Sequence, residues 1–143
     1  MKSKILVFVQ FLMIFLMLVP FMESHAYPLL GSGFLFLGLL VGFLAIKQQP
    51  KNNFNIRPDL KENCTLVTDG IYAYIRHPMY FSVLVGMFGV LLLKFNLLEL
   101  GFYIILLINM LIKMLYEEKL WHCETQEYKK YSQTTARLIP KIF

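Results

Sequence analysis

Residues 74–80, YIRHPMY, concentrate polar side chains directly before a long apolar run. Proline is tolerated in the first turn of a helix because its missing N–H would have no partner there, so Pro78 predicts a helix start. An Asp-Gly turn is predicted just upstream, at residues 69–70. Arg76 and His77 then lie at the positive end of the helix dipole, beside free backbone N–H groups. This arrangement favours an anionic ligand such as a carboxylate or a phosphate. Each residue taken singly also suits a membrane boundary, where Arg snorkels and Tyr forms an aromatic belt.

A second candidate group, Glu117 and Glu118, closes the last apolar run, in the sequence LYEEKLW. Charges at a membrane boundary face protein or a water-filled cavity rather than lipid. The alternative is an interfacial acidic pair that is matched by Lys113 or Lys119. The stretch that begins at this pair, EEKLWHCETQEYKKY, has a helical pattern, which predicts that the helix continues beyond the apolar run.

Four apolar runs must position these groups. The chain has 143 residues, of which 57% are hydrophobic, and its mean hydropathy of +0.58 is typical of a membrane protein rather than a soluble domain. The runs cover residues 5–22, 29–46, 79–93 and 97–115. Each approaches the roughly 20 residues that cross a bilayer; the third is short and requires its ends to lie in the interfaces. Gln10 and Pro20 alone interrupt the first run.

The predicted fold class is therefore all-α. We expect an integral membrane protein of a single domain over residues 1–143, with about four transmembrane helices and a cytoplasmic helical tail over residues 116–143. The last two runs are expected to form a helical hairpin. A linker rich in Pro, Asn and Lys follows the second run at residues 48–57.

The basic residues predict the orientation of the chain in the membrane. The formal net charge is +5, and every large Lys- and Arg-containing segment falls on one side of four spans. By the positive-inside rule this side is the cytoplasm, so both termini and the candidate site are expected there, in an inner (plasma) membrane or an ER-type membrane.

The two cysteines, Cys64 and Cys123, fall on the same side, and neither a disulfide nor a metal site is expected. The first run, followed by Ser24-His25-Ala26, also resembles a signal peptide, but it is longer than a usual hydrophobic region, which favours a retained helix.

Small residues predict how two of the helices pack. Gly38 and Gly42 have the GxxxG spacing that lets helix backbones approach closely, and Ser82 and Gly86 permit the same in the third run. The segment Gly31-Ser32-Gly33 lies at the extracytoplasmic end in this topology.

Three blocks now occur together in one order: DGIYAYIRHPMYFSVLVGMFG, a hydrophobic hairpin, and LYEEKLWHCETQEYKKYSQTTARLIPKIF. They resemble the C-terminal half of the isoprenylcysteine carboxyl methyltransferase and phospholipid N-methyltransferase superfamily, over about half of the chain. The positions that match this pattern are Gly70, Tyr72, Arg76, His77, Pro78, Tyr80, Glu117, Glu118, Glu127, Tyr128, Tyr131, Arg137 and Pro140.

This resemblance implies a small helical membrane enzyme that uses S-adenosylmethionine, held on the cytoplasmic side. The cofactor's carboxylate suits the helix start, and its cationic groups suit the acidic pair. Tyr72, Tyr80, Trp121 and Tyr128 offer ring faces to adenine or to the sulfonium. The implied catalytic residues are Arg76, His77, Glu117 and Glu118. The implied cofactor-binding residues are Tyr72, Arg76, His77, Pro78, Tyr80, Glu117 and Glu118, with no metal.

The resemblance also implies the kinds of partner, but it does not decide whether the methyl acceptor is a carboxylate or an amine. The acceptor is expected to be a lipid-like or prenylated molecule that enters from the bilayer, with no nucleic acid, and the protein is expected to be a monomer or a helix-mediated dimer. The complete Arg-His-Pro element and the RLIP ending favour carboxyl methylation, whereas GSGF and the short chain favour phospholipid N-methylation. The remaining alternatives are an NADPH-dependent enzyme like the sterol reductases and an inactive membrane subunit.

Overall fold

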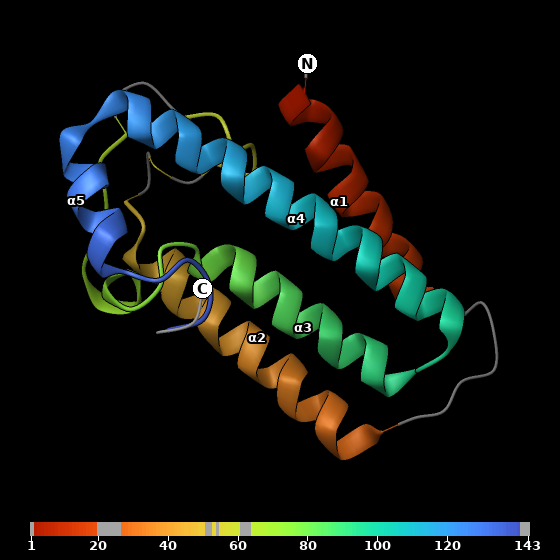
Figure 1. Ribbon diagram of the computed structural model, residues 1–143. Coiled ribbons are helices and arrows are strands. Elements are labelled where there is room, and N and C mark those ends of the chain that lie inside the picture. Colours follow the sequence, from red (N-terminus) through yellow and green to blue (C-terminus); the bar gives the residue numbers. More distant parts are fainter. Residues whose placement is uncertain (1, 20–26, 51–52, 54, 61–63, 141–143) are drawn as a thin grey trace.

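The computed structural model describes residues 2–19, 27–50, 53, 55–60 and 64–140, and all regular elements in these ranges are helical. The helices are α1 (Lys2–Leu18), α2 (Pro28–Gln48), α3 (Pro78–Leu93), α4 (Leu97–Glu124) and α5 (Gln126–Thr134), with a short 3₁₀ helix, η1 (Gly70–Ala73). Four long helices pack as a bundle, and α5 lies at one end of it (Figure 1). The predicted all-α class is confirmed. The predicted cleavage site at residues 24–26 lies outside the described residues.

Two helices, α2 with 21 residues and α4 with 28, are long and apolar enough to cross a membrane. Helix α3 is also apolar but has only 16 residues, and α1 has 17, so both are shorter than the usual span of about 20 residues. Of the four predicted spans, two are therefore supported by length and composition, and the other two stay predictions.

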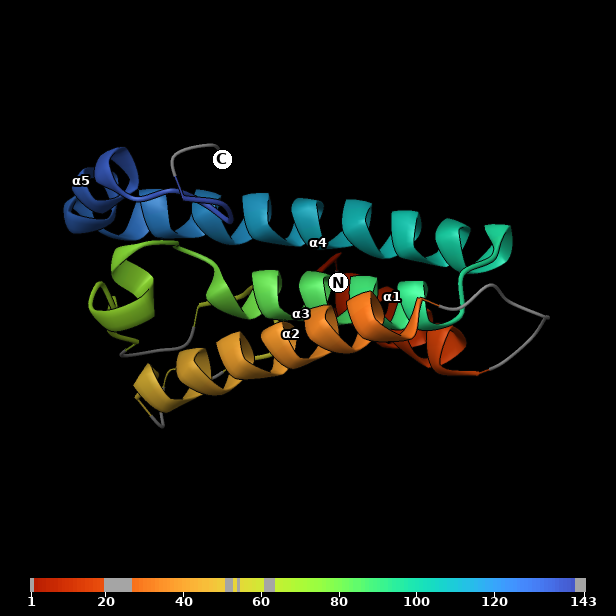
Figure 2. The same ribbon diagram turned by 90° about the horizontal axis from the view of Figure 1, so that it is seen from below.

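Helix α3 lies between α2 and α4 (Figure 2). Its contact with α2 is made by glycines, as the spacing predicts. A Cβ on Gly38 would lie 2.6 Å from the Gly86 Cα, and a Cβ on Gly42 would lie 3.2 Å from the Ser82 Oγ. Near the other end of α2, a Cβ on Gly31 would lie 2.9 Å from the Gly89 carbonyl oxygen. The two helices therefore run antiparallel, with their backbones in direct contact.

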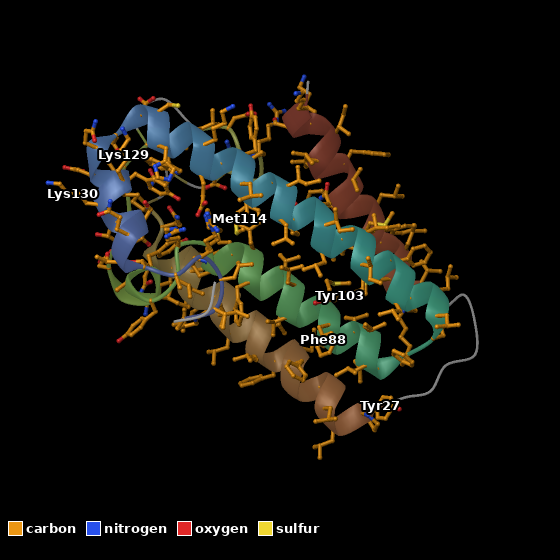
Figure 3. The ribbon with its side chains drawn as sticks, viewed as in Figure 1. Tyr27, Phe88, Tyr103, Met114, Lys129 and Lys130 are labelled. Atoms are coloured by element: carbon orange, nitrogen blue, oxygen red, sulfur yellow. The ribbon has the colours of Figure 1, made fainter. Side chains whose placement is uncertain are left out.

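The predicted hairpin is formed by α3 and α4. Asn96 caps α4, because its side chain accepts a hydrogen bond from the Glu99 N–H at 2.9 Å. The buried Glu99 carboxylate also pairs with Lys94 at 3.0 Å. Between the two helices, the rings of Phe88 and Tyr103 meet with their centroids 5.6 Å apart (Figure 3). Helix α1 packs against α4, where Asn109 donates to the Leu6 carbonyl at 3.0 Å.

Helix α4 continues without a break to Glu124, as the helical pattern after the apolar run predicts. Thr125 then caps α5 by accepting a hydrogen bond from the Tyr128 N–H. After α5 the chain returns to the start of α3: the Arg76 N–H donates to the Ala136 carbonyl at 2.8 Å, and the His77 N–H donates to the Arg137 carbonyl at 3.0 Å. These bonds join the Arg-His-Pro segment to residues 135–140, the C-terminal segment. Helix α3 begins at Pro78, as predicted.

Candidate active site

A cavity of about 380 Å³ lies at the end of the bundle where α4 meets α5. Its volume falls in the range of sites for small molecules, roughly 300–1,000 Å³. All five α-helices contribute to its walls, and a further wall comes from the described part of residues 53–67. That segment includes part of the predicted linker, which therefore does more than connect α2 to the motif region.

The Asp-Gly turn at residues 69–70 places Tyr72 at the cavity. Gly70 has a φ of +57°, a conformation that glycine adopts readily, and it begins η1. The Gln48 side chain packs against Gly70 and accepts a hydrogen bond from the Ile71 N–H at 2.8 Å. The end of α2 thus fixes the orientation of η1, from which Tyr72 reaches the cavity.

Arg76 lines the cavity, but its guanidinium is occupied by protein groups. The Nε and Nη2 atoms donate to Glu118 Oε1 at 3.0 and 2.8 Å. The Nη1 atom donates to the Ser132 carbonyl at 2.6 Å and to the Thr135 carbonyl. Arg76 therefore joins α4 to the last turn of α5 and to Thr135, the residue that follows it.

Glu118 accepts from three cationic or potentially cationic side chains. Besides Arg76, its carboxylate lies 3.3 Å from His77 Nε2 and accepts from Arg137 Nε at 2.9 Å. The side chains of Arg76 and Glu118 are only 7% and 5% exposed. Breaking such a buried pair leaves an uncompensated charge, which makes the group a strong structural element.

Glu117 has different surroundings from its neighbour. Its carboxylate lines the cavity and accepts a hydrogen bond from the Tyr80 hydroxyl at 2.6 Å. The Tyr80 ring stands edge-on to the His77 ring, with their centroids 5.4 Å apart. Glu117, Tyr80 and His77 therefore form one connected polar group on the cavity wall.

Lys113 and Gln10 form a second polar group in the same cavity. Lys113 Nζ donates to Gln10 Oε1 at 2.7 Å and lies 5.4 Å from the centroid of the Tyr80 ring. Both side chains belong to residues that are buried, at 4% and 8% exposure. They join α4 to α1 across 103 positions of sequence.

Aromatic side chains line the part of the cavity near α5. The rings of Trp121 and Tyr128 stack with their centroids 5.8 Å apart. The Tyr131 hydroxyl donates to the Tyr72 carbonyl, and Gln49 Nε2 donates to the Tyr72 hydroxyl at 2.8 Å. Burial raises the pKa values of Tyr72, Tyr128 and Tyr131, and nearby Glu118 raises that of Tyr128 further. These phenols therefore remain protonated at neutral pH.

Two buried polar atoms of this aromatic part have no hydrogen-bond partner among the described residues: Gln49 Oε1 and the Tyr128 hydroxyl. Both residues line the cavity. Buried polar atoms in folded proteins are nearly always hydrogen-bonded, so these two atoms mark unused hydrogen-bonding capacity in the residues that form the cavity wall.

Most of the residues that sequence analysis selected meet at this cavity. Tyr72, Arg76, His77, Tyr80 and Glu117 line it, as do Trp121 and Tyr128, whereas Pro78 and Glu118 are not among its lining residues. Pro78 begins α3, and Glu118 binds the arginines behind the wall. The direct contacts of these residues with reactants stay predictions.

Sequence reasoning missed Gln10, Gln49 and Lys113 as residues of the site. A signal for two of them exists: Gln10 is one of two interruptions in the first apolar run, and Lys113 is a charge inside the last one. Polar and ionisable residues inside apolar segments are costly and are retained mainly for function. No comparable signal marks Gln49, which lies in a polar stretch.

Comparison with known proteins identifies the family of the chain. A family model described as "Isoprenylcysteine carboxyl methyltransferase (ICMT) family" matches residues 31–122, which is well over half of the chain. The matched segment contains Gln49, Tyr72, Lys113 and the acidic pair, and it excludes α1 and α5. No match was found among curated proteins.

Proposed function

Because the chain belongs to the isoprenylcysteine carboxyl methyltransferase family, a family of membrane methyltransferases, we propose that it methylates the carboxylate of a membrane-embedded, isoprenylcysteine-like acceptor with S-adenosylmethionine as the methyl donor. The observation that carries the proposal is the cavity itself. Its walls combine an aromatic part, which contains two unpaired polar atoms, with a charged part from α4.

The aromatic part suits the cofactor. S-adenosylmethionine, when bound, supplies a methyl group on a positively charged sulfur. Gln49 Oε1 and the Tyr128 hydroxyl offer unused hydrogen-bonding capacity to its polar groups. The faces of Trp121 and Tyr128 suit a flat base or a cation, and the Glu117 carboxylate favours positive charge nearby. The residues present therefore fit this cofactor.

Positioning and exclusion of water supply most of the catalysis in this proposal. A carboxylate is already a nucleophile at neutral pH, so no general base is required to activate it. Holding the two reactants in line within one cavity converts their reaction into an effectively unimolecular step. Glu117, His77 and Tyr80 would contact the reactants, while Arg76 and Glu118 would hold the wall in place through their ion pair.

The apolar side of the cavity suits a lipid-like acceptor. Phe11 and Ile46 line the cavity and are also exposed on the outer surface of the bundle. An acceptor dissolved in the bilayer would reach the cavity between such side chains, with the site near the cytoplasmic face of the membrane. Of the features that favoured phospholipid N-methylation, the Gly31-Ser32-Gly33 segment lies away from the cavity, where Gly31 packs on α3 and a Cβ on Gly33 would meet nothing within 4 Å.

The first test is calorimetric binding of S-adenosylmethionine to the detergent-purified protein, with NADPH as the competing candidate. Tyr128→Phe removes an unpaired hydroxyl without removing a hydrogen bond within the described part of the protein. We expect it to weaken cofactor binding by about five- to tenfold, because one neutral hydrogen bond contributes about 1 kcal/mol, and to leave the melting temperature unchanged. The matched control is Tyr74→Phe, at an exposed position of the same residue type.

Methylation is then measured with radiolabelled cofactor and two acceptors, farnesylated N-acetylcysteine and phosphatidylethanolamine. Transfer to the first alone supports the proposal. Transfer to the second alone would replace carboxyl methylation by phospholipid N-methylation. A folded protein that binds no S-adenosylmethionine would contradict the proposal as a whole.

A further inference from the structure

Lys113 is a buried cation whose charge is not matched by a carboxylate in contact with it. It is 4% exposed, and none of the ion pairs among the described residues includes it. Its single hydrogen-bond partner in this part of the chain is the neutral Gln10, at 2.7 Å. An ammonium group has three N–H donors and is costly to bury without a counter-ion.

The carboxylate nearest to Lys113 along α4 attracts the ammonium through space but does not form an ion pair with it. Glu117, one helical turn further on, accepts the Tyr80 hydroxyl at 2.6 Å. The Tyr80 ring instead offers Lys113 its face, at 5.4 Å from the ring centroid. Lys113 therefore lines the cavity with only one of its three N–H donors engaged by the described residues, and an anionic acceptor within the cavity would engage the others.

The surroundings of Lys113 also differ from those of the aromatic part. This part of the cavity is lined by residues from three helices: Gln10 of α1, Val83 of α3 and Met110 of α4. The stacked Trp121 and Tyr128 line the part near α5. Met114, the residue after Lys113, is fully buried on the side of α4 that faces α3 (Figure 3). A ligand whose anionic group binds Lys113 would therefore place its apolar remainder among the helices.

We propose that Lys113, held in place by Gln10, binds the carboxylate of the acceptor and makes the site prefer the charged acid over its methylated product. This inference rests on the proposed function, since it assigns one residue pair to the acceptor of that reaction. Lys113 Nζ would donate to one carboxylate oxygen and leave the other free to attack. Once the ester has formed, the acceptor has no negative charge, so Lys113 no longer attracts it and the product is released.

The proposal also gives α1 a role in the site. Gln10 lies outside the segment that matches the family model, yet its side-chain oxygen fixes the position of the Lys113 ammonium. The Gln10 side chain would thus be a positioning residue that acts through Lys113.

The test compares binding of farnesylated N-acetylcysteine with binding of its methyl ester, followed through the fluorescence of Trp121, the single tryptophan, in the cavity wall. Wild-type protein is expected to bind the acid about ten- to hundredfold more tightly than the ester, the usual contribution of a charge-assisted hydrogen bond. Lys113→Met is expected to abolish this preference while the affinity for S-adenosylmethionine stays within about twofold. Lys113→Arg should restore most of the preference, and Gln10→Leu should reduce it by several fold.

The matched control is Lys119→Met, which removes an exposed lysine from the same helix. In turnover, Lys113→Met should raise the KM for the acid at least about tenfold with a smaller change in kcat. If Lys113→Met does not fold, the comparison of Lys113→Arg and Gln10→Leu with wild type carries the test.

Three results would overturn the inference, and they differ from failure of the proposed function. In the first, acid and ester bind equally well to wild type. In the second, Lys113→Met weakens binding of S-adenosylmethionine and leaves the acid preference intact, so that Lys113 belongs to the cofactor. In the third, the anion is a lipid phosphate: Lys113→Met weakens binding of phosphatidylethanolamine and leaves binding of the farnesylated acid unchanged. The proposed function itself fails if wild type does not bind the cofactor or does not methylate the acid.

Discussion

Glu117 and Glu118 are neighbours in the chain but have different partners. Successive residues of a helix point about 100° apart, so Glu117 faces the cavity and Tyr80, while Glu118 faces Arg76, His77 and Arg137. The two carboxylates therefore separate into one that a ligand can reach and one that joins three segments of the protein. A Glu→Gln substitution is therefore expected to have different effects at the two positions.

Glu118→Gln removes the negative charge between two arginines and is expected to destabilise the protein. Arg76 would remain buried without a counter-ion, a loss of about 3 kcal/mol in the free energy of unfolding. Thermal unfolding in detergent measures the effect. Glu124→Gln, at an exposed position near the end of the same helix, is the control and should change the melting temperature little. Equal melting temperatures for both variants would show that the ion pair contributes no stability.

At the scale of elements, the contact between α2 and α3 is the closest helix pairing in the bundle. Gly38 lies against the Gly86 backbone, with no space for a side chain. Because lipid tails are as apolar as leucine, helices in a membrane associate through close packing of small residues rather than through the hydrophobic effect. The pairing holds Gly42, Ile46 and Gln49 against the α3 residues that line the cavity.

Gly38→Ala is expected to push α2 away from α3, since its Cβ would lie 2.6 Å from backbone atoms that cannot rotate aside. Overpacking of this kind costs about 1–3 kcal/mol, and the resulting shift of α2 should also weaken cofactor binding. Gly33→Ala is the matched control in the same helix, because nothing lies within 4 Å of its added Cβ. It should be neutral or slightly stabilising. Equal stability of the two variants would contradict the packing role of Gly38.

At the scale of the whole molecule, α5 lies at one end of the bundle (Figure 1), and its residues Tyr128 and Tyr131 line the cavity. On α5, Lys129 and Lys130 are exposed and point away from the bundle (Figure 3). Under the positive-inside rule such basic side chains belong on the cytoplasmic side, and this orientation stays a prediction.

The two cysteines allow a direct test of this orientation. Cys123 is exposed near the end of α4, so in a Cys64→Ser variant it is the single thiol. A membrane-impermeant maleimide should label Cys123 in inside-out vesicles and leave it unlabelled in right-side-out vesicles. The reverse pattern would place the cavity on the opposite side of the membrane.

The sequence by itself determined the local elements and the family. Pro78 sets the start of α3, and the glycine spacing predicts the contact of α2 with α3. These features depend on residues that are close in the chain or on a simple helical period, so a pattern in the sequence reveals them. The motif blocks likewise predicted the family to which the chain belongs.

Only the tertiary structure decided how the site is divided among these elements. The pairing of Lys113 with Gln10 joins positions 103 residues apart, and the wall from the described part of residues 53–67 comes from a segment without helical pattern. Which of two adjacent glutamates faces the cavity depends on the rotation of α4 against α3 and the C-terminal segment, which local sequence does not set. Such contacts arise from the packing of whole helices, and for that reason the spacing of residues revealed the motif but not the partners of each side chain.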